Sequence, residues 1–184
     1  MKKIILIVAA ALVSLSASAQ KFAHVNFNEL VMLMPAADSA RAQIAASQQE
    51  AQDTYKSMTD EFQVKYQQYQ QKSSTWTPAI RESKEKELQD IQTRIQDFDQ
   101  SIQQELQQQQ QQLMAPIQQR AVAAVEKLAK EGGYIDVFEK ASMLYVDETQ
   151  SVDLTPAARK ALNIPDGRTL ETLQQELQAQ AQKQ

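Results

Sequence analysis

The stretch KSSTWTP, residues 72–78, separates two long segments in which apolar residues recur every three or four positions. The first segment has the set Tyr55, Met58, Phe62, Tyr66 and Tyr69, and the second has Leu88, Ile91, Ile95, Phe98, Ile102, Leu106, Leu113 and Ile117. This spacing keeps the residues of each set on one side of an α-helix. The sequence therefore predicts two amphipathic helices folded into a long antiparallel hairpin over residues 35–131, with its tip at 73–78.

Residues that favour helix ends support this hairpin. Thr77 can cap a helix and Pro78 suits the first helical position, where no backbone N–H is needed. Gly132 and Gly133 suit the end of the second helix, because glycine tolerates the left-handed conformation found there. Pro116 lies within the second helix, where we expect a kink or bend rather than an end.

The segments on either side of the hairpin show strand-like patterns. Residues 22–27 alternate as in a strand, after which Asn28 is expected to cap a short helix that breaks near Pro35. The runs 134–138 and 143–147, joined by four residues, favour a β-hairpin. The motif Asp153-Leu154-Thr155-Pro156 predicts a short helix ending near Leu162. Leu170, Leu173 and Leu177 predict another amphipathic helix within the C-terminal extension, residues 164–184.

The predicted base comprises residues 20–34 and 132–163, which are too few to form a stable core alone without metal or disulfide. The chain contains no cysteine, so association with other copies is the remaining way to build a shared core and to cover free strand edges. The candidate residues of this shared base are Val25, Phe27, Ile135, Val137, Leu144 and Val146. The predicted class is α+β, mostly α, with a long hairpin on a small β base.

Residues 1–19 have the pattern of a signal peptide. Lys2 and Lys3 precede an apolar run at 4–15, and Ala17-Ser18-Ala19 forms a small-x-small cleavage site. We expect cleavage near Ala19 and export from the cytoplasm. The alternative is a retained N-terminal anchor, which the small-x-small site disfavours.

The charge of the chain limits its partners. Without residues 1–19 the chain has 17 basic and 23 acidic residues, a net charge of −6. An acidic chain of this kind is not expected to bind nucleic acid, because phosphate contacts need clustered Lys and Arg. The chain also contains 31 glutamines, with a nearly continuous block at 103–112. A solvated helix face is the favoured interpretation of that block, and disorder or aggregation is the alternative.

No residue pattern predicts catalysis or a cofactor. His24 is the only histidine, and we interpret it as a structural residue with satisfied hydrogen bonds. The three glycines, Gly132, Gly133 and Gly167, form no phosphate-binding loop. We therefore expect neither enzymatic nor ATP-driven activity.

Three segments together make the chain similar to the Skp family of periplasmic chaperones, also called the OmpH family. They are residues 22–30, residues 132–137 followed by Leu144-Tyr145-Val146-Asp147, and Asp153-Leu154-Thr155 followed by Leu162. The resemblance implies a homotrimer with a β-barrel-like base and helical arms around a cavity. It also implies an ATP-independent periplasmic holdase for unfolded outer-membrane β-barrel proteins. The acidic charge argues against the binding of lipopolysaccharide or of a membrane surface.

The candidate client-contacting residues are Met58, Tyr66, Tyr69 and Trp76. The first three are more often part of a helix-pair core, although their outer edges could line a cavity. Trp76 could contact a client or pack over the turn, and both interpretations stay open. The alternative function is a structural or adaptor protein of the cell envelope that docks one fixed partner.

Overall fold

The computed structural model describes residues 21–182, so the predicted signal peptide at 1–19 and its cleavage site lie outside the described residues. The described chain is mostly helical and contains a three-stranded sheet, which confirms the predicted α+β, mostly α class. In chain order the elements are β1 (Lys21–Val25), α2 (Phe27–Leu33), α3 (Pro35–Lys72), η2 (Ser73–Thr75), α4 (Pro78–Gly132), β2 (Tyr134–Glu139), η3 (Lys140–Ser142), β3 (Ser151–Asp153), α5 (Thr155–Ala161) and α6 (Leu170–Ala181).

The described residues form two compact units. One unit contains residues 21–33 and 120–182 and includes the sheet, and the other contains Met34–Gln119 and includes the helical hairpin. The division falls within α4. The sequence predicts that residues 120–131 belong to the arm and that residues 164–184 form a separate extension. The structure groups 120–131 and 164–182 with the sheet, because the end of α4 lines a groove with β2 and α6 contacts α2.

The sheet has β1 at its centre, with β2 and β3 on either side, and both pairings are parallel. The register places Phe22 opposite Asp136 and Ser151, Ala23 opposite Val137 and Val152, and His24 opposite Phe138 and Asp153. Ala23, His24 and Val25 are buried. This short central strand therefore supplies part of the core of its unit and joins two segments that come much later in the chain.

The predicted β-hairpin between 134–138 and 143–147 is wrong. The first run forms β2, but the second forms no strand, and the third strand is Ser151–Asp153. Leu144 is fully exposed and Tyr145 is 81% exposed. The apolar run at 143–147 has the composition of a strand, but a strand also needs a free edge to pair with. The free edge of β1 is taken by β3, where Ser151 and Asp153 also contact the buried His24.

The helix after β1 starts earlier than predicted. Phe27 belongs to α2 and not to the strand, because the helix cap is Asn26 and not Asn28. The Asn26 Oδ1 atom accepts a hydrogen bond from the backbone N–H of Glu29 at 3.1 Å, which satisfies a free donor of the first helical turn. The predicted break near Pro35 is confirmed, since Met34 is extended and Pro35 begins α3.

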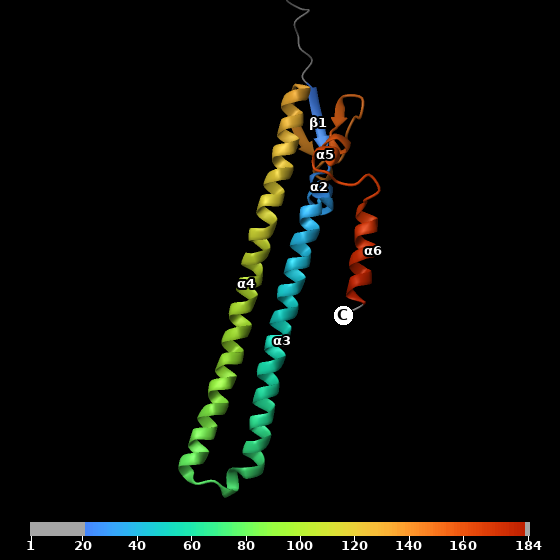
Figure 1. Cartoon of the computed structure of the whole chain (residues 1–184). Helices are drawn as coiled ribbons and strands as arrows, with labels where there is room; N and C mark the ends of the chain where they lie inside the picture. The colour runs from blue at the N-terminus through green and yellow to red at the C-terminus, as the bar shows by residue number, and fades with distance from the viewer. Residues whose placement is uncertain (1–20, 183–184) are drawn as a thin grey trace, which may run out of the picture. The chain divides into compact units, whose positions relative to one another are not determined.

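Helices α3 and α4 lie side by side in the unit formed by Met34–Gln119, joined by the turn that contains η2 (Figure 1). Thr77 Oγ1 accepts a hydrogen bond from the backbone N–H of Ile80 at 3.4 Å, and α4 begins at Pro78, as predicted. Pro116 lies inside α4 without ending it, and the glutamine block at 103–112 is helical. The sequence therefore located the hairpin and its turn correctly.

The C-terminal segment is anchored to the sheet-containing unit by Arg159. Its guanidinium donates to Glu29 Oε1 on α2 at 2.5 Å and to the carbonyl oxygens of Pro165 at 3.0 Å and Arg168 at 2.5 Å. Leu162, Ile164 and Leu173 are buried. Both predicted C-terminal helices are present, as α5 and α6, so residues 164–182 form part of a packed unit.

We predict that Gly133→Ala destabilises the protein by about 1 kcal/mol, because Gly133 has a φ of +68°, where a side chain is strained. The measurement is the free energy of unfolding in urea. Gly167→Ala is the matched control, since a Cβ at Gly167 has nothing within 4 Å and the residue has no positive φ. Equal stability of both variants would contradict this assignment.

Candidate functional site

The two apolar stripes of the hairpin are only partly covered. Ile91 and Ile117 are buried, with 4% of each exposed, whereas most other stripe residues are half-buried. Tyr55 and Tyr66 remain 43% and 45% exposed. Two helices cover each other along one line only, so without a third layer the edges of large side chains stay in contact with water. The hairpin therefore presents apolar surface along its length.

The aromatic residues near the tip pack mainly against their own neighbours. Phe62 and Tyr66 are stacked, with ring centroids 5.9 Å apart and an interplanar angle of 8°. Tyr69 and Trp76 meet edge to face, with centroids 5.9 Å apart and an angle of 64°. Trp76 thus packs over the turn and is half-buried. Met58 is also half-buried, so each of the four candidate client-contacting residues keeps some accessible surface.

Ion pairs join the two helices near the tip. Arg94 Nη2 donates to Glu61 Oε2 at 2.9 Å, and Lys65 Nζ donates to Glu87 Oε1. The hydrogen bonds from Lys65 and from Lys84 lower the pKa of Glu87 from 4.5 to about 2. The hydrogen bond to Glu87 in turn raises the pKa of Lys65. These polar contacts join the two helices on either side of the buried Ile91.

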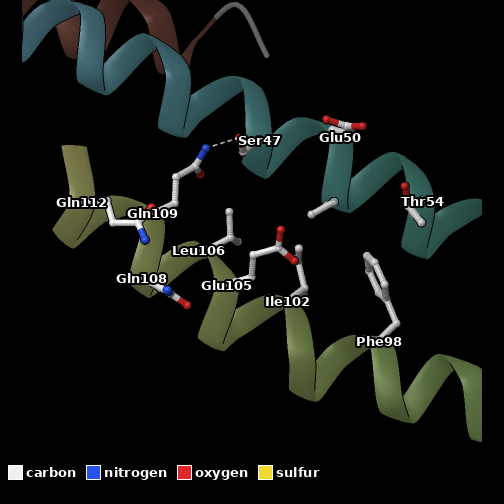
Figure 2. Close-up of a pocket in the computed structure, with 11 residues that line it drawn as sticks. Ser47, Glu50, Thr54, Phe98, Ile102, Glu105, Leu106, Gln108, Gln109 and Gln112 are labelled. Carbon is white, nitrogen blue, oxygen red and sulfur yellow. Dashed lines mark hydrogen bonds between the residues drawn. The ribbon is translucent and has the colours of Figure 1, made fainter.

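A cleft of about 500 Å³ opens between the middle parts of α3 and α4 (Figure 2). Phe98, Ile102 and Leu106 on α4 extend toward α3, where Ala51 and Ser47 are small. Gln109 Nε2 donates to Ser47 Oγ at 2.9 Å and closes one end of the cleft. The small residues of α3 do not fill the space opposite the large side chains of α4, so the cleft stays open between the two helices.

A second concave surface lies in the sheet-containing unit. This surface, the base groove, is a largely apolar groove of about 510 Å³ lined by residues of β1, α2, α4 and β2. Four of the predicted base residues line it together: Val25, Phe27, Ile135 and Val137. Ile135 is 52% exposed, so the groove presents apolar surface to solvent.

The other two predicted base residues do not line this groove. Leu144 is fully exposed and Val146 is half-buried, and both lie in the segment between η3 and β3. Together with Tyr145, Leu144 forms an exposed apolar loop. The structure thus brings four of the six predicted base residues to one groove and leaves Leu144 and Val146 outside its lining.

His24 is completely buried. The prediction of a histidine with satisfied hydrogen bonds is confirmed for Nδ1 but not for Nε2. Its Nδ1 atom lies 2.9 Å from Ser151 Oγ, whereas Nε2 has no hydrogen-bond partner among the described residues and lies 3.8 Å from Asp153 Oδ2. Burial alone would raise the pKa of Asp153, but hydrogen bonds from Thr155, with His24 and Lys140 nearby, lower it. This polar contact links β1 to β3.

No group of three metal-ligating side chains occurs within residues 21–182. Among the helices of the same residues, none combines the length and the apolar character needed to span a bilayer.

Several residues of these surfaces were missed by analysis of the sequence. Val122, Val125 and Ala129 line the base groove, although they were assigned to the arm. Their spacing of three and four residues continues the helical period beyond Pro116 but does not show what the face contacts. The cross-helix pair of Glu61 and Arg94 carries no local signal either, because the two residues are 33 positions apart.

The structure defines a class of protein with a long helical hairpin, a small parallel sheet and open surfaces suited to binding. The family model described as "Outer membrane protein (OmpH-like)" matches residues 21–162. The chain therefore belongs to the OmpH-like family, whose members are periplasmic chaperones of outer-membrane proteins, and the predicted resemblance is confirmed. The comparison with curated proteins gives no match.

We predict that Glu87→Gln reduces the acid sensitivity of the hairpin. Because the folded-state pKa of Glu87 is lowered from 4.5 to about 2, the carboxylate stabilises the fold above about pH 4.5, and this contribution is lost as the pH falls toward 2. Thermal unfolding followed by circular dichroism at about pH 6 and about pH 3 should show a smaller difference in melting temperature for the variant.

Glu82→Gln provides the control, since Glu82 lies on the same exposed stretch of α4 and forms no ion pair with any residue in 21–182. The same reduction in both variants would show that general charge, and not the contact with Lys65, determines the acid response.

Proposed function

We propose that this chain is an ATP-independent periplasmic holdase, a trimer whose arms keep unfolded outer-membrane proteins soluble. The observation that carries the proposal is the partly covered apolar stripe that runs along α3 and α4, within a chain that belongs to the OmpH-like family. A holdase needs accessible apolar surface that is dispersed rather than gathered in one deep pocket. Otherwise it would select one ligand instead of many unfolded chains.

The proposed mechanism uses many weak contacts. Met58, Tyr66, Tyr69 and Trp76 each offer limited apolar area, so a single contact has low affinity and dissociates quickly. Several contacts made by several arms bind much more tightly, because each later contact forms at a high local concentration. The client remains disordered and leaves when its own folding becomes more favourable, which requires no nucleotide.

Assembly into a trimer is supported by the apolar surfaces of the sheet-containing unit. The groove that contains Ile135 and the loop that contains Leu144 both expose large apolar side chains. Such surfaces are characteristic of interaction sites. A contact between two different surfaces of neighbouring copies can close into a ring, which is the symmetry that a trimer requires.

We predict that the chain without residues 1–19 suppresses precipitation when a denatured outer-membrane β-barrel protein is diluted from urea. Tyr66→Ala should weaken the suppression about two- to fivefold in the concentration required, because one of several apolar contacts is lost. Gln67→Ala on the same helix is the control, since Gln67 is exposed and polar. Light scattering reports precipitation.

The rival function, docking of one fixed partner, gives a different result in that assay. It predicts no suppression at stoichiometric trimer and a single partner after mild crosslinking in the periplasm, lost on Trp76→Ala. The holdase predicts many crosslinked β-barrel proteins and a modest effect of Trp76→Ala, because Trp76 packs partly on Tyr69.

We predict that Ile135→Asp weakens assembly, because it places a charge in the apolar base groove. Its melting temperature should fall by several degrees and depend more strongly on protein concentration than that of the unchanged chain. Val64→Asp is the control, since Val64 is similarly exposed, at 54%, but lies on α3. An equal effect of both substitutions would argue against the groove as the interface.

A further inference from the structure

The middle of the hairpin carries negative charge without any basic residue. Helix α3 has no Lys or Arg between Arg41 and Lys56, and α4 has none between Arg94 and Arg120. The same stretches contain five carboxylates: Glu50, Asp53, Asp97, Asp99 and Glu105. Toward the tip, residues 56–94 are nearly balanced, with seven basic and six acidic side chains. The excess negative charge of the hairpin is therefore concentrated in its middle.

The cleft between α3 and α4 lies in this same region. Its apolar floor is formed by Phe98, Ile102 and Leu106, all of them half-buried. Glu50 and Glu105 are among its lining residues, and Figure 2 shows Glu105 extending from α4 toward α3 beside Leu106. Among residues 21–182 neither carboxylate has an ion-pair partner. An apolar floor thus combines with carboxylates that are free to bind a cation.

We propose that this cleft binds a segment of an unfolded polypeptide in which an aromatic or aliphatic side chain lies next to Lys or Arg. The apolar side chain enters between Ala51 and Ile102, and the neighbouring cation pairs with Glu50 or Glu105. The site rests on the proposed holdase function and specifies the kind of client segment that one arm selects.

Size and charge together identify this occupant. A space of about 500 Å³ is within the range that accommodates a large side chain and its neighbours. No basic side chain lines the cleft, so an acidic segment would be repelled and a basic one attracted. The amides of Gln108 and Gln112 can bond to an extended backbone, which suits a disordered chain.

Two pairs of variants test the site in the full chain without residues 1–19. Ala51→Leu fills the cleft, and Ala45→Leu adds the same side chain at an exposed position of α3 that lies outside it. Glu50→Gln with Glu105→Gln removes both carboxylates. Asp60→Asn with Glu82→Gln makes the same change in net charge outside the cleft. Circular dichroism confirms that each variant retains its helices.

The probes are three fluorescent unstructured peptides of about 15 residues. The first has Phe flanked by Lys, the second has Phe flanked by Glu, and the third has Lys without Phe. Fluorescence anisotropy gives the dissociation constant in about 50 mM and about 300 mM salt, which separates charge effects from apolar contact. A benzophenone in place of Phe in the first peptide allows crosslinked residues to be located by mass spectrometry.

We expect the Lys-flanked Phe peptide to bind most tightly and to crosslink within 47–54 or 98–112, the two stretches that line the cleft. Ala51→Leu should weaken its binding about tenfold, a loss of about 1.4 kcal/mol. The Gln double variant should weaken binding severalfold in low salt and little in high salt, because screening already reduces the charge contribution there. Both control variants should bind as the unchanged chain does.

The site would be overturned if Ala51→Leu bound the peptide normally, if the Glu-flanked peptide bound as tightly, or if crosslinks fell outside both 47–54 and 98–112. Precipitation of a denatured β-barrel protein is measured in parallel. Suppression by the unchanged chain together with normal peptide binding by Ala51→Leu would contradict the cleft while supporting the holdase. Cleft-dependent peptide binding without suppression would support the cleft and contradict the holdase.

Discussion

The sheet depends on β1 pairing with two strands that follow the whole helical hairpin in the sequence. Parallel strands cannot be joined by a tight turn and need a crossover, which here includes α2, α3 and α4. Closing a flexible connection of this length would cost on the order of 4 kcal/mol of chain entropy, more than so short a strand pair can readily offset. The sheet therefore depends on the connection being helical, and its stability is coupled to that of the hairpin.

The two units are stabilised in different ways. The sheet-containing unit has a buried core around Ala23, Leu30, Ala158 and Leu173, with polar links from Arg159 and His24. The hairpin has few buried residues and relies more on helix formation and on its half-buried apolar stripes, with ion pairs such as that of Arg94 with Glu61 between the helices. Exposed ion pairs contribute little stability individually. The hairpin is therefore packed less tightly than the sheet-containing unit, and the edges of its apolar side chains stay accessible.

The sequence predicted features that depend on local chemistry. Helical spacing located α3, α4 and α6, and Thr77 with Pro78 and Gly132 with Gly133 located the ends of α4. Features that depend on distant partners were not predictable in this way. Residues 143–147 have the composition of a strand, yet β1 pairs with Ser151–Asp153, whose segment also meets His24 across more than a hundred positions. The cleft likewise forms only where residues of α3 such as Ala51 and residues of α4 such as Ile102 line the same space.

The exposed apolar surfaces of the sheet-containing unit link the fold to the proposed assembly. Within residues 21–182, Ile135, Leu144 and Tyr145 keep large exposed apolar surfaces, and exposed apolar surface of this kind is characteristic of interaction sites. The most direct test is the molar mass in solution of the chain without residues 1–19, measured by multi-angle light scattering at micromolar concentration. A mass three times that of one chain is the predicted result, and a folded species with the mass of a single chain would contradict the account.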